Sequence, residues 1–213
     1  EDSIISNDFS NATATSTGSV WSLSLTLGQG TTAIQFYATD AAGNRSEPAS
    51  VSVFVDGAAP DISLTSSTCS GTLSTSACLV ATTTLAFSWE SGASDLAYFN
   101  LDANGTVSTT SALSFSVTGT DETTYTFNVA AVDTRGNVSA TSTQAVDIYT
   151  RPVVINEIAW AGTAASFADE WVELYNRTGR DISLSNFVVY TADMTPYIPL
   201  SGTISAGGYF LIE

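Results

Sequence analysis

Apolar and polar residues alternate along most of this chain. Ile34, Phe36 and Ala38 form one such stretch, and a second runs from Tyr125 to Ala131. Alternation with a period of two is the pattern of a β-strand that buries one of its faces. No window shows a sustained apolar spacing of 3.6 residues bounded by capping residues, so the pattern predicts an all-β fold with little helix.

The central part of the chain shows the strand pattern most completely. Turn-forming stretches separate its apolar runs at distances that suit a β-sandwich. Leu85, Phe87 and Trp89 end one run, and we expect Trp89 to fill the core; the alternative is an exposed tryptophan that stacks on carbohydrate. The predicted strands are Ile62 to Leu64, Leu79 to Trp89, Ala97 to Leu101, Leu113 to Val117, Thr124 to Val132 and Gln144 to Tyr149.

One short stretch occurs twice. Residues 38–46 read Ala-Thr-Asp-Ala-Ala-Gly-Asn-Arg-Ser and residues 131–139 read Ala-Val-Asp-Thr-Arg-Gly-Asn-Val-Ser, so the aspartate moves from position 40 to position 133, close to the length of one sandwich domain. Asp accepts backbone N–H bonds two residues on, and Gly and Asn tolerate positive φ, so each copy predicts a turn between two strands, with calcium binding as the alternative. The turn residues are Asp40, Gly43 and Asn44 in the first copy and Asp133, Gly136 and Asn137 in the second.

Two junctions divide the chain into three predicted domains. Residues 56–60 read Asp-Gly-Ala-Ala-Pro and residues 149–152 read Tyr-Thr-Arg-Pro, where proline interrupts a strand ladder. The predicted domains are therefore a partial repeat at 1–57, a complete repeat at 58–150 and a different domain at 151–213. Such short linkers predict a semi-rigid array. We also expect the chain to be a piece of a longer protein.

Charge restricts the partners that the chain can bind. The 213 residues carry a formal net charge of -16, with five arginines, no lysine and no histidine. A phosphate-neutralising surface cannot be assembled from so few cations, which argues against direct nucleic-acid binding, and an anionic membrane surface would repel the chain. No run approaches the roughly 20 apolar residues that span a bilayer, so we predict no transmembrane segment.

The two cysteines, Cys69 and Cys78, lie in a stretch rich in Ser, Thr and Gly. A disulfide between them suits an oxidising compartment, and closing a loop of this size contributes roughly 2 to 3 kcal/mol in the loop-entropy account. Two reduced thiols in adjacent strands are the alternative. A metal site is the least favoured reading, because the chain has no histidine and no second cysteine pair.

The third domain carries three phrases in order. Residues 155–157 read Ile-Asn-Glu, residues 170–176 read Glu-Trp-Val-Glu-Leu-Tyr-Asn, and residues 181–185 read Asp-Ile-Ser-Leu-Ser. They resemble the lamin tail domain, an Ig-like β-sandwich of nuclear lamins and of many secreted or surface-attached bacterial proteins. The resemblance covers the N-terminal part of such a domain and implies a truncated sandwich. The repeated turn is similar to one in bacterial Ig-like and fibronectin type III-like surface repeats, so the fold expected is a tandem of Ig-like sandwiches.

Four carboxylates accompany the lamin-tail-like phrases. They are Glu157, Asp169, Glu170 and Glu173, and they lie near strands that are expected to pair. One interpretation is that they are solvated or bonded to backbone N–H groups or to arginine. The alternatives are that they coordinate Ca²⁺ or that two of them serve as an acid/base pair. Further aspartates lie at turns and junctions and motivate a hypothesis of calcium-rigidified adhesion. They are Asp40, Asp56, Asp61, Asp133 and Asp147.

The sequence favours binding over catalysis. It has no histidine base, no Gly-x-Ser-x-Gly elbow, no phosphate-binding Gly-Lys-Ser/Thr loop and no zinc motif. We therefore expect a non-catalytic protein of the extracellular space or cell envelope. Its Ig-like repeats would act as a stalk, its lamin-tail-like domain would bind a protein or glycan at the cell surface, and it would need no cofactor unless Ca²⁺ binds. The alternative is an accessory region of a larger secreted hydrolase or nuclease.

Overall fold

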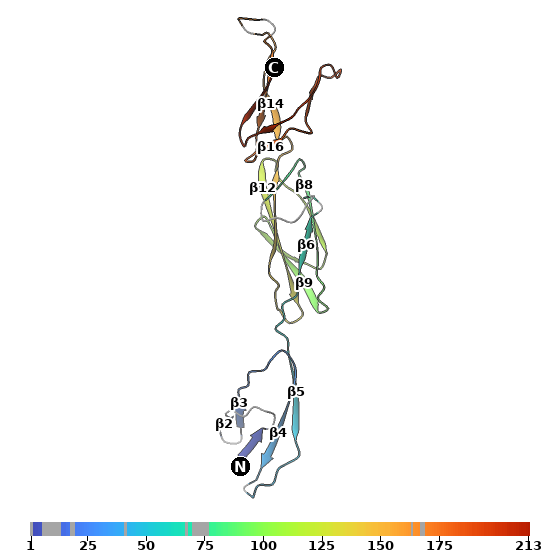
Figure 1. The fold of residues 1–213 in the computed structure, drawn as a ribbon. Coiled ribbons are helices and arrows are strands. Elements are labelled where there is room, and N and C mark those ends of the chain that lie inside the picture. Colours follow the sequence, from blue (N-terminus) through green and yellow to red (C-terminus); the bar gives the residue numbers. More distant parts are fainter. Residues whose placement is uncertain are drawn as a thin grey trace. The chain divides into compact units, whose positions relative to one another are not determined.

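The chain is built from β-strands (Figure 1). The structure, a computed structural model, describes residues 2–5, 14–17, 20–40, 42–66, 68–69, 77–162, 164–166 and 169–213. All the regular elements formed by these residues are β-strands, which confirms the all-β prediction. None of these residues forms a helix able to cross a membrane. By spatial grouping the chain forms two compact units, residues 1–61, 92–98 and 131–140 in one and the remainder in the other.

Every strand pairing between named strands stays inside one of the three predicted segments among the described residues. The first segment holds a three-stranded antiparallel sheet in the order β1-β4-β5 and the hairpin β2-β3. Ile34 of β4 is buried here. The spatial grouping nevertheless assigns residues 92–98 and 131–140 of the second segment, which are loops with the adjoining strand ends, to the first unit, so the three-domain division stays a prediction. The strands are β1 (Asp2–Ile5), β2 (Ala14–Thr17), β3 (Val20–Leu23), β4 (Gly30–Thr39) and β5 (Ala49–Val55).

The second segment is a sandwich of two sheets. A five-stranded sheet has the order β10-β9-β12-β13-β7, and a three-stranded sheet has the order β11-β8-β6. The pairs β10-β9, β12-β13, β11-β8 and β6-β8 are antiparallel, and β13 and β7 are parallel. A disulfide joins Cys69 to Cys78, whose Cα atoms lie 6.0 Å apart. The strands are β6 (Ser63–Ser66), β7 (Cys78–Val80), β8 (Thr84–Glu90), β9 (Leu96–Ala103), β10 (Thr106–Thr110), β11 (Ser114–Thr118), β12 (Thr123–Asp133) and β13 (Ser142–Ile148).

Aromatic rings from both sheets fill the core of this sandwich. Phe87 and Phe127 stack with their ring centroids 4.4 Å apart, and Trp89 lies 5.7 Å from Phe127 and, edge-on, 5.7 Å from Phe99. Each of these four side chains is no more than 3% exposed. Trp89 therefore fills the core as predicted and does not offer its ring to carbohydrate.

One strand prediction in this segment was wrong, and one strand was not predicted. The predicted strand from Leu79 to Trp89 is two strands that belong to different sheets, because the chain leaves β13 after Val80 and joins β6 and β11 from Thr84 onward. The edge strand β10 was missed because its Thr-Val-Ser-Thr-Thr sequence has little apolar alternation. The Asn104-Gly105 pair before it, both at positive φ, is the hairpin signal that could have identified β10.

The third segment packs three small sheets around one apolar core. The sheets are β14-β15-β20, β16-β19 and β17-β18, all antiparallel. Leu174, Leu184, Leu200 and Ile204 are the buried centre of the core. The strands are β14 (Val153–Ala159), β15 (Trp171–Asn176), β16 (Ile182–Ser183), β17 (Val188–Tyr190), β18 (Tyr197–Pro199), β19 (Thr203–Ile204) and β20 (Tyr209–Ile212).

Asn176, the last residue of β15, is fully buried and holds two loops of this segment together, the one after β15 and the one after β19. Its side-chain amide donates to the carbonyl oxygens of Arg180, Ile204 and Ser205 at 2.7, 3.1 and 2.9 Å. Its Oδ1 accepts bonds from the backbone N–H and the hydroxyl of Thr178 at 2.9 and 2.8 Å. The Asn176 side chain is thus the centre of a buried hydrogen-bond network.

We expect Asn176→Ala to lower the free energy of unfolding by about 3 kcal/mol, because carbonyl groups that bond to the amide would be left without a donor. Urea unfolding followed by circular dichroism measures the change. Asn186→Ala is the matched control, since Asn186 is exposed, and it should change stability little. Equal effects of the two variants would contradict the assigned role of Asn176.

Candidate functional site

The repeated stretch folds into a turn between two antiparallel strands. In the first copy it joins β4 to β5, and Oδ1 of Asp40 accepts the backbone N–H groups of Ala42 and Asn44, both at 2.9 Å. Oδ2 of Asp40 accepts the side-chain amide of Asn44 at 2.8 Å. Gly43 has a φ of +90°, a conformation that favours glycine. One carboxylate therefore organises the whole turn.

The second copy repeats this geometry between β12 and β13. Oδ1 of Asp133 accepts the backbone N–H groups of Arg135 and Asn137, both at 2.8 Å, and Oδ2 accepts the Asn137 side-chain amide at 2.7 Å. Gly136 also has a φ of +90°. The asparagines differ from the prediction: neither has positive φ, and each instead donates its amide to the aspartate.

A serine closes each turn in the same way. Ser46 accepts the Ala38 backbone N–H on its hydroxyl at 3.0 Å and returns its own backbone N–H to the Ala38 carbonyl at 2.8 Å. Ser139 forms the corresponding pair with Ala131, at 2.9 Å for both bonds. The serine hydroxyl therefore continues the ladder beyond the last regular strand pair.

Both turn aspartates are held in the ionised form. Hydrogen bonds from the side chain and backbone of Asn44 lower the pKa of Asp40. Desolvation acts to raise the pKa of Asp133, which is 2% exposed, but hydrogen bonds from Asn137, Arg135 and Gly136 together lower it below its ordinary value. Each carboxylate therefore contributes stability while it is charged.

Asp133 also belongs to a group of three carboxylates inside the first compact unit. One carboxylate oxygen from each of Asp56, Asp95 and Asp133 lies within 4.8 Å of the other two. Two hydrogen bonds to backbone carbonyls bring the loops together: the backbone N–H of Thr134 donates to the Asp95 carbonyl at 2.9 Å, and the side-chain amide of Asn137 donates to the Asp56 carbonyl at 3.2 Å. Three oxygens would be a partial ligand set for Ca²⁺, which takes six to eight.

The four carboxylates predicted in the lamin-tail-like segment lie at or before β14 and β15. Glu157 is the cross-strand neighbour of Glu173, and Asn156, at a bulge in β14, donates its side-chain amide to Oε1 of Glu173 at 2.6 Å. Asp169 and Glu170 are exposed just before β15. Among the described residues, the three-carboxylate group at metal-ligand distance contains none of these four.

The other junction aspartates bind backbone and arginine groups. Asp61 accepts the Gly92 N–H at 3.0 and 3.1 Å. Asp147 pairs with Arg180, whose guanidinium also donates to the Ala77 carbonyl at 2.7 Å, and Glu122 pairs with Arg177. Both ion pairs connect the second segment to the third within the second compact unit. The sequence analysis did not predict these two ion pairs, because neither the charge of the residues nor their spacing along the chain indicates which acidic residue pairs with which arginine.

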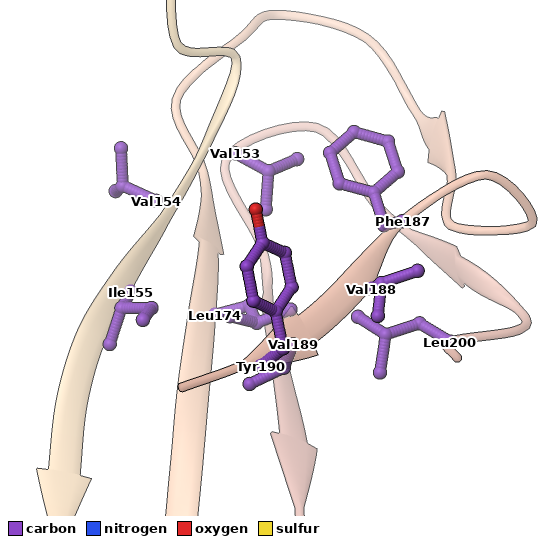
Figure 2. A pocket seen from close by; sticks show the side chains of 9 residues that line it. All are labelled: Val153, Val154, Ile155, Leu174, Phe187, Val188, Val189, Tyr190 and Leu200. Carbon is purple, nitrogen blue, oxygen red and sulfur yellow. The ribbon is translucent and has the colours of Figure 1, made fainter. Parts of the chain in front are cut away.

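An apolar pocket of about 180 Å³ opens in the third segment. In Figure 2, Val153 to Ile155 of β14 line one side, Val188 to Tyr190 of β17 line the other, and the remaining labelled residues lie between them or beside β17. The Tyr190 hydroxyl is the one polar side-chain group in this lining. The pocket therefore offers apolar contact and little hydrogen bonding.

Comparisons with known proteins give no family. No protein-family model and no curated protein matches the chain. It is similar to the chitinase ChiA74 from Bacillus thuringiensis, with 14% identity and a TM-score of 0.31 over 72% of this chain and 26% of that one. It is also similar to SGBP-B of the Bacteroides ovatus mixed-linkage glucan utilization locus, solved with a mixed-linkage heptasaccharide, with 12% identity and a TM-score of 0.21 over 99% and 58% of the two chains. Both scores are too low to carry an argument about function.

The lowered pKa of Asp133 predicts a dependence of stability on acid. Asp133→Asn should lower the melting temperature near neutral pH, where the native carboxylate is charged and accepts its hydrogen bonds. As the pH falls from about 5 through the lowered pKa, the native protein loses this contribution and the variant has none to lose, so the two melting temperatures should converge. Differential scanning calorimetry across this range measures both, with the exposed Glu90→Gln as control. A difference that stays constant down to about pH 2 would contradict the assignment.

Proposed function

We propose that this chain is a non-catalytic structural or adhesion segment of an extracellular or cell-envelope protein. The recurrence of the aspartate turn, with the same hydrogen bonds around Asp40 and Asp133, is the observation that carries the proposal. Two copies of one module in tandem are typical of the stalks of surface proteins, in which Ig-like repeats hold a binding domain away from the cell. The lamin-tail-like segment is then the binding module.

Hydrogen bonds and ion pairs at the two junctions support the role of a stalk. Asn137 of the second repeat bonds to the carbonyl of Asp56 in the first linker, and Arg177 and Arg180 pair with Glu122 and Asp147 across the second linker. Such bonds restrict the linkers beyond what their short length does. The disulfide between Cys69 and Cys78 supports an oxidising location. The formal charge of -16 suits a hydrated outer surface.

Antibodies raised against this chain should label intact cells of its source as strongly as permeabilised cells, because an extracellular or envelope location exposes the chain. An antibody to a cytoplasmic protein, which should label permeabilised cells alone, is the control. Thiol alkylation before reduction, followed by mass spectrometry, should find Cys69 and Cys78 oxidised. Labelling confined to permeabilised cells, together with alkylated cysteines, would overturn the location. A hydrolase or nuclease domain in the same reading frame would favour the accessory role instead.

Calcium-dependent stabilisation is a second candidate function, favoured by the meeting of Asp56, Asp95 and Asp133. Both turns use their aspartate in the same way, but only the second is joined by two further carboxylates among the described residues. A divalent cation would relieve the repulsion among these three charges.

In this case millimolar Ca²⁺, the range in which extracellular modules bind, should raise the melting temperature of the native chain. Asp95→Asn should abolish the increase and, without calcium, should raise the melting temperature, because it removes one of three repelling charges. Mg²⁺ is the control ion, and Glu90→Gln is the control variant. An unchanged melting temperature and no heat of Ca²⁺ binding in calorimetry would rule this candidate out.

A further inference from the structure

The outer face of the β14-β15-β20 sheet combines exposed aromatic rings with carboxylates. Leu174 of β15 and Phe210 of β20 point into the core of the segment. Because side chains alternate along a strand, Tyr175 and Tyr209 point to the opposite face. These two tyrosines are cross-strand neighbours with ring centroids 4.9 Å apart, and Tyr209 is 58% exposed.

The same face continues along β15 with a polar row and then another ring. Glu173 lies two residues before Tyr175 and is the cross-strand neighbour of Glu157. It accepts a hydrogen bond from the side-chain amide of Asn156 at 2.6 Å. Trp171, two residues before Glu173, is half-buried. Its position four residues before Tyr175 places it roughly 13 Å from that tyrosine along the strand. Rings therefore lie at both ends of this face, and between them Glu173 has Glu157 as its neighbour on β14 and the exposed Leu211 as its neighbour on β20.

Charge decides which ligand this face suits. Among the described residues neither Glu157 nor Glu173 forms an ion pair, so an apolar protein surface that covered the sheet would bury two uncompensated carboxylates at a high cost. A polyanion would be repelled by these groups and by the net charge of -16. A neutral polyol avoids both costs, because its hydroxyls donate to carboxylates and its C–H faces pack on aromatic rings.

We propose that this face binds a neutral glycan chain. Tyr175 and Tyr209 stack on one sugar unit, Trp171 contacts another, and Glu173 and Asn156 hydrogen-bond to hydroxyl groups between them. The assignment deepens the proposed function and rests on it, since it gives the binding module at the cell surface a class of ligand. It concerns the outer face of the sheet, whereas the apolar pocket of Figure 2 extends from its edge strand toward β17.

Affinity electrophoresis of the whole chain tests the inference, with hydroxyethyl cellulose, galactomannan and arabinogalactan as neutral probes and polygalacturonate as the anionic probe. We expect at least one neutral probe to retard the native chain and polygalacturonate to leave it unretarded. Tyr209→Ala should weaken binding about tenfold, which corresponds to about 1.4 kcal/mol. Glu173→Gln should weaken it too, because a charged acceptor is replaced by a neutral one.

Tyr190→Ala is the matched control. Tyr190 is 57% exposed and stacks on Tyr197 at 6.4 Å in the same segment, but it belongs to β17. This variant should bind within about twofold of the native chain. Retardation by none of the neutral probes, native binding by Tyr209→Ala with an unchanged melting temperature, or an equal loss in Tyr190→Ala would overturn the inference. A protein that labels at the cell surface but binds no probe would refute the glycan site alone, whereas a chain that binds but stays inside cells would refute the proposed location.

Discussion

Polar side chains at strand ends take up backbone groups that the strand ladders leave unpaired, and much of this structure depends on that constraint. Backbone N–H and C=O groups buried without partners are costly, and short strands expose many ladder ends. Asp40 and Asp133 accept such backbone groups at two turns, and the Asn176 amide donates to them where two loops of the third segment meet. Asp133 and Asn176 are almost completely buried, so solvent cannot replace their hydrogen bonds.

The same chemistry connects turns to junctions. Asn137 completes the second turn through its bond to Asp133 and also reaches the first linker at Asp56. The first turn uses the same residue types, and its bonds stay within the turn and its flanking strands. One module therefore serves as a hairpin closure in both copies, and in the second it also contributes to a linker contact.

In the third segment, one face of the β14-β15-β20 sheet packs on the apolar core and the other face carries aromatic and charged side chains. Inward residues of β14, β15 and β20 join a core centred on Leu174, and outward residues present tyrosines beside carboxylates. Because strand geometry alone separates these sets, binding chemistry can change on the outer face without disturbing the core. A β-sandwich is for this reason a suitable carrier for ligand sites of many kinds.

The sequence by itself determined the strand class, the two repeated turns and the core position of Trp89, because alternation and turn chemistry act between residues close in the chain. It did not determine that residues 79–89 divide between two sheets, because pairing partners lie far away in sequence. Only the tertiary structure brought Asp95 to Asp56 and Asp133, paired Arg180 with Asp147, and set Tyr209 beside Tyr175. Such contacts depend on register and topology, which a pattern of period two leaves open.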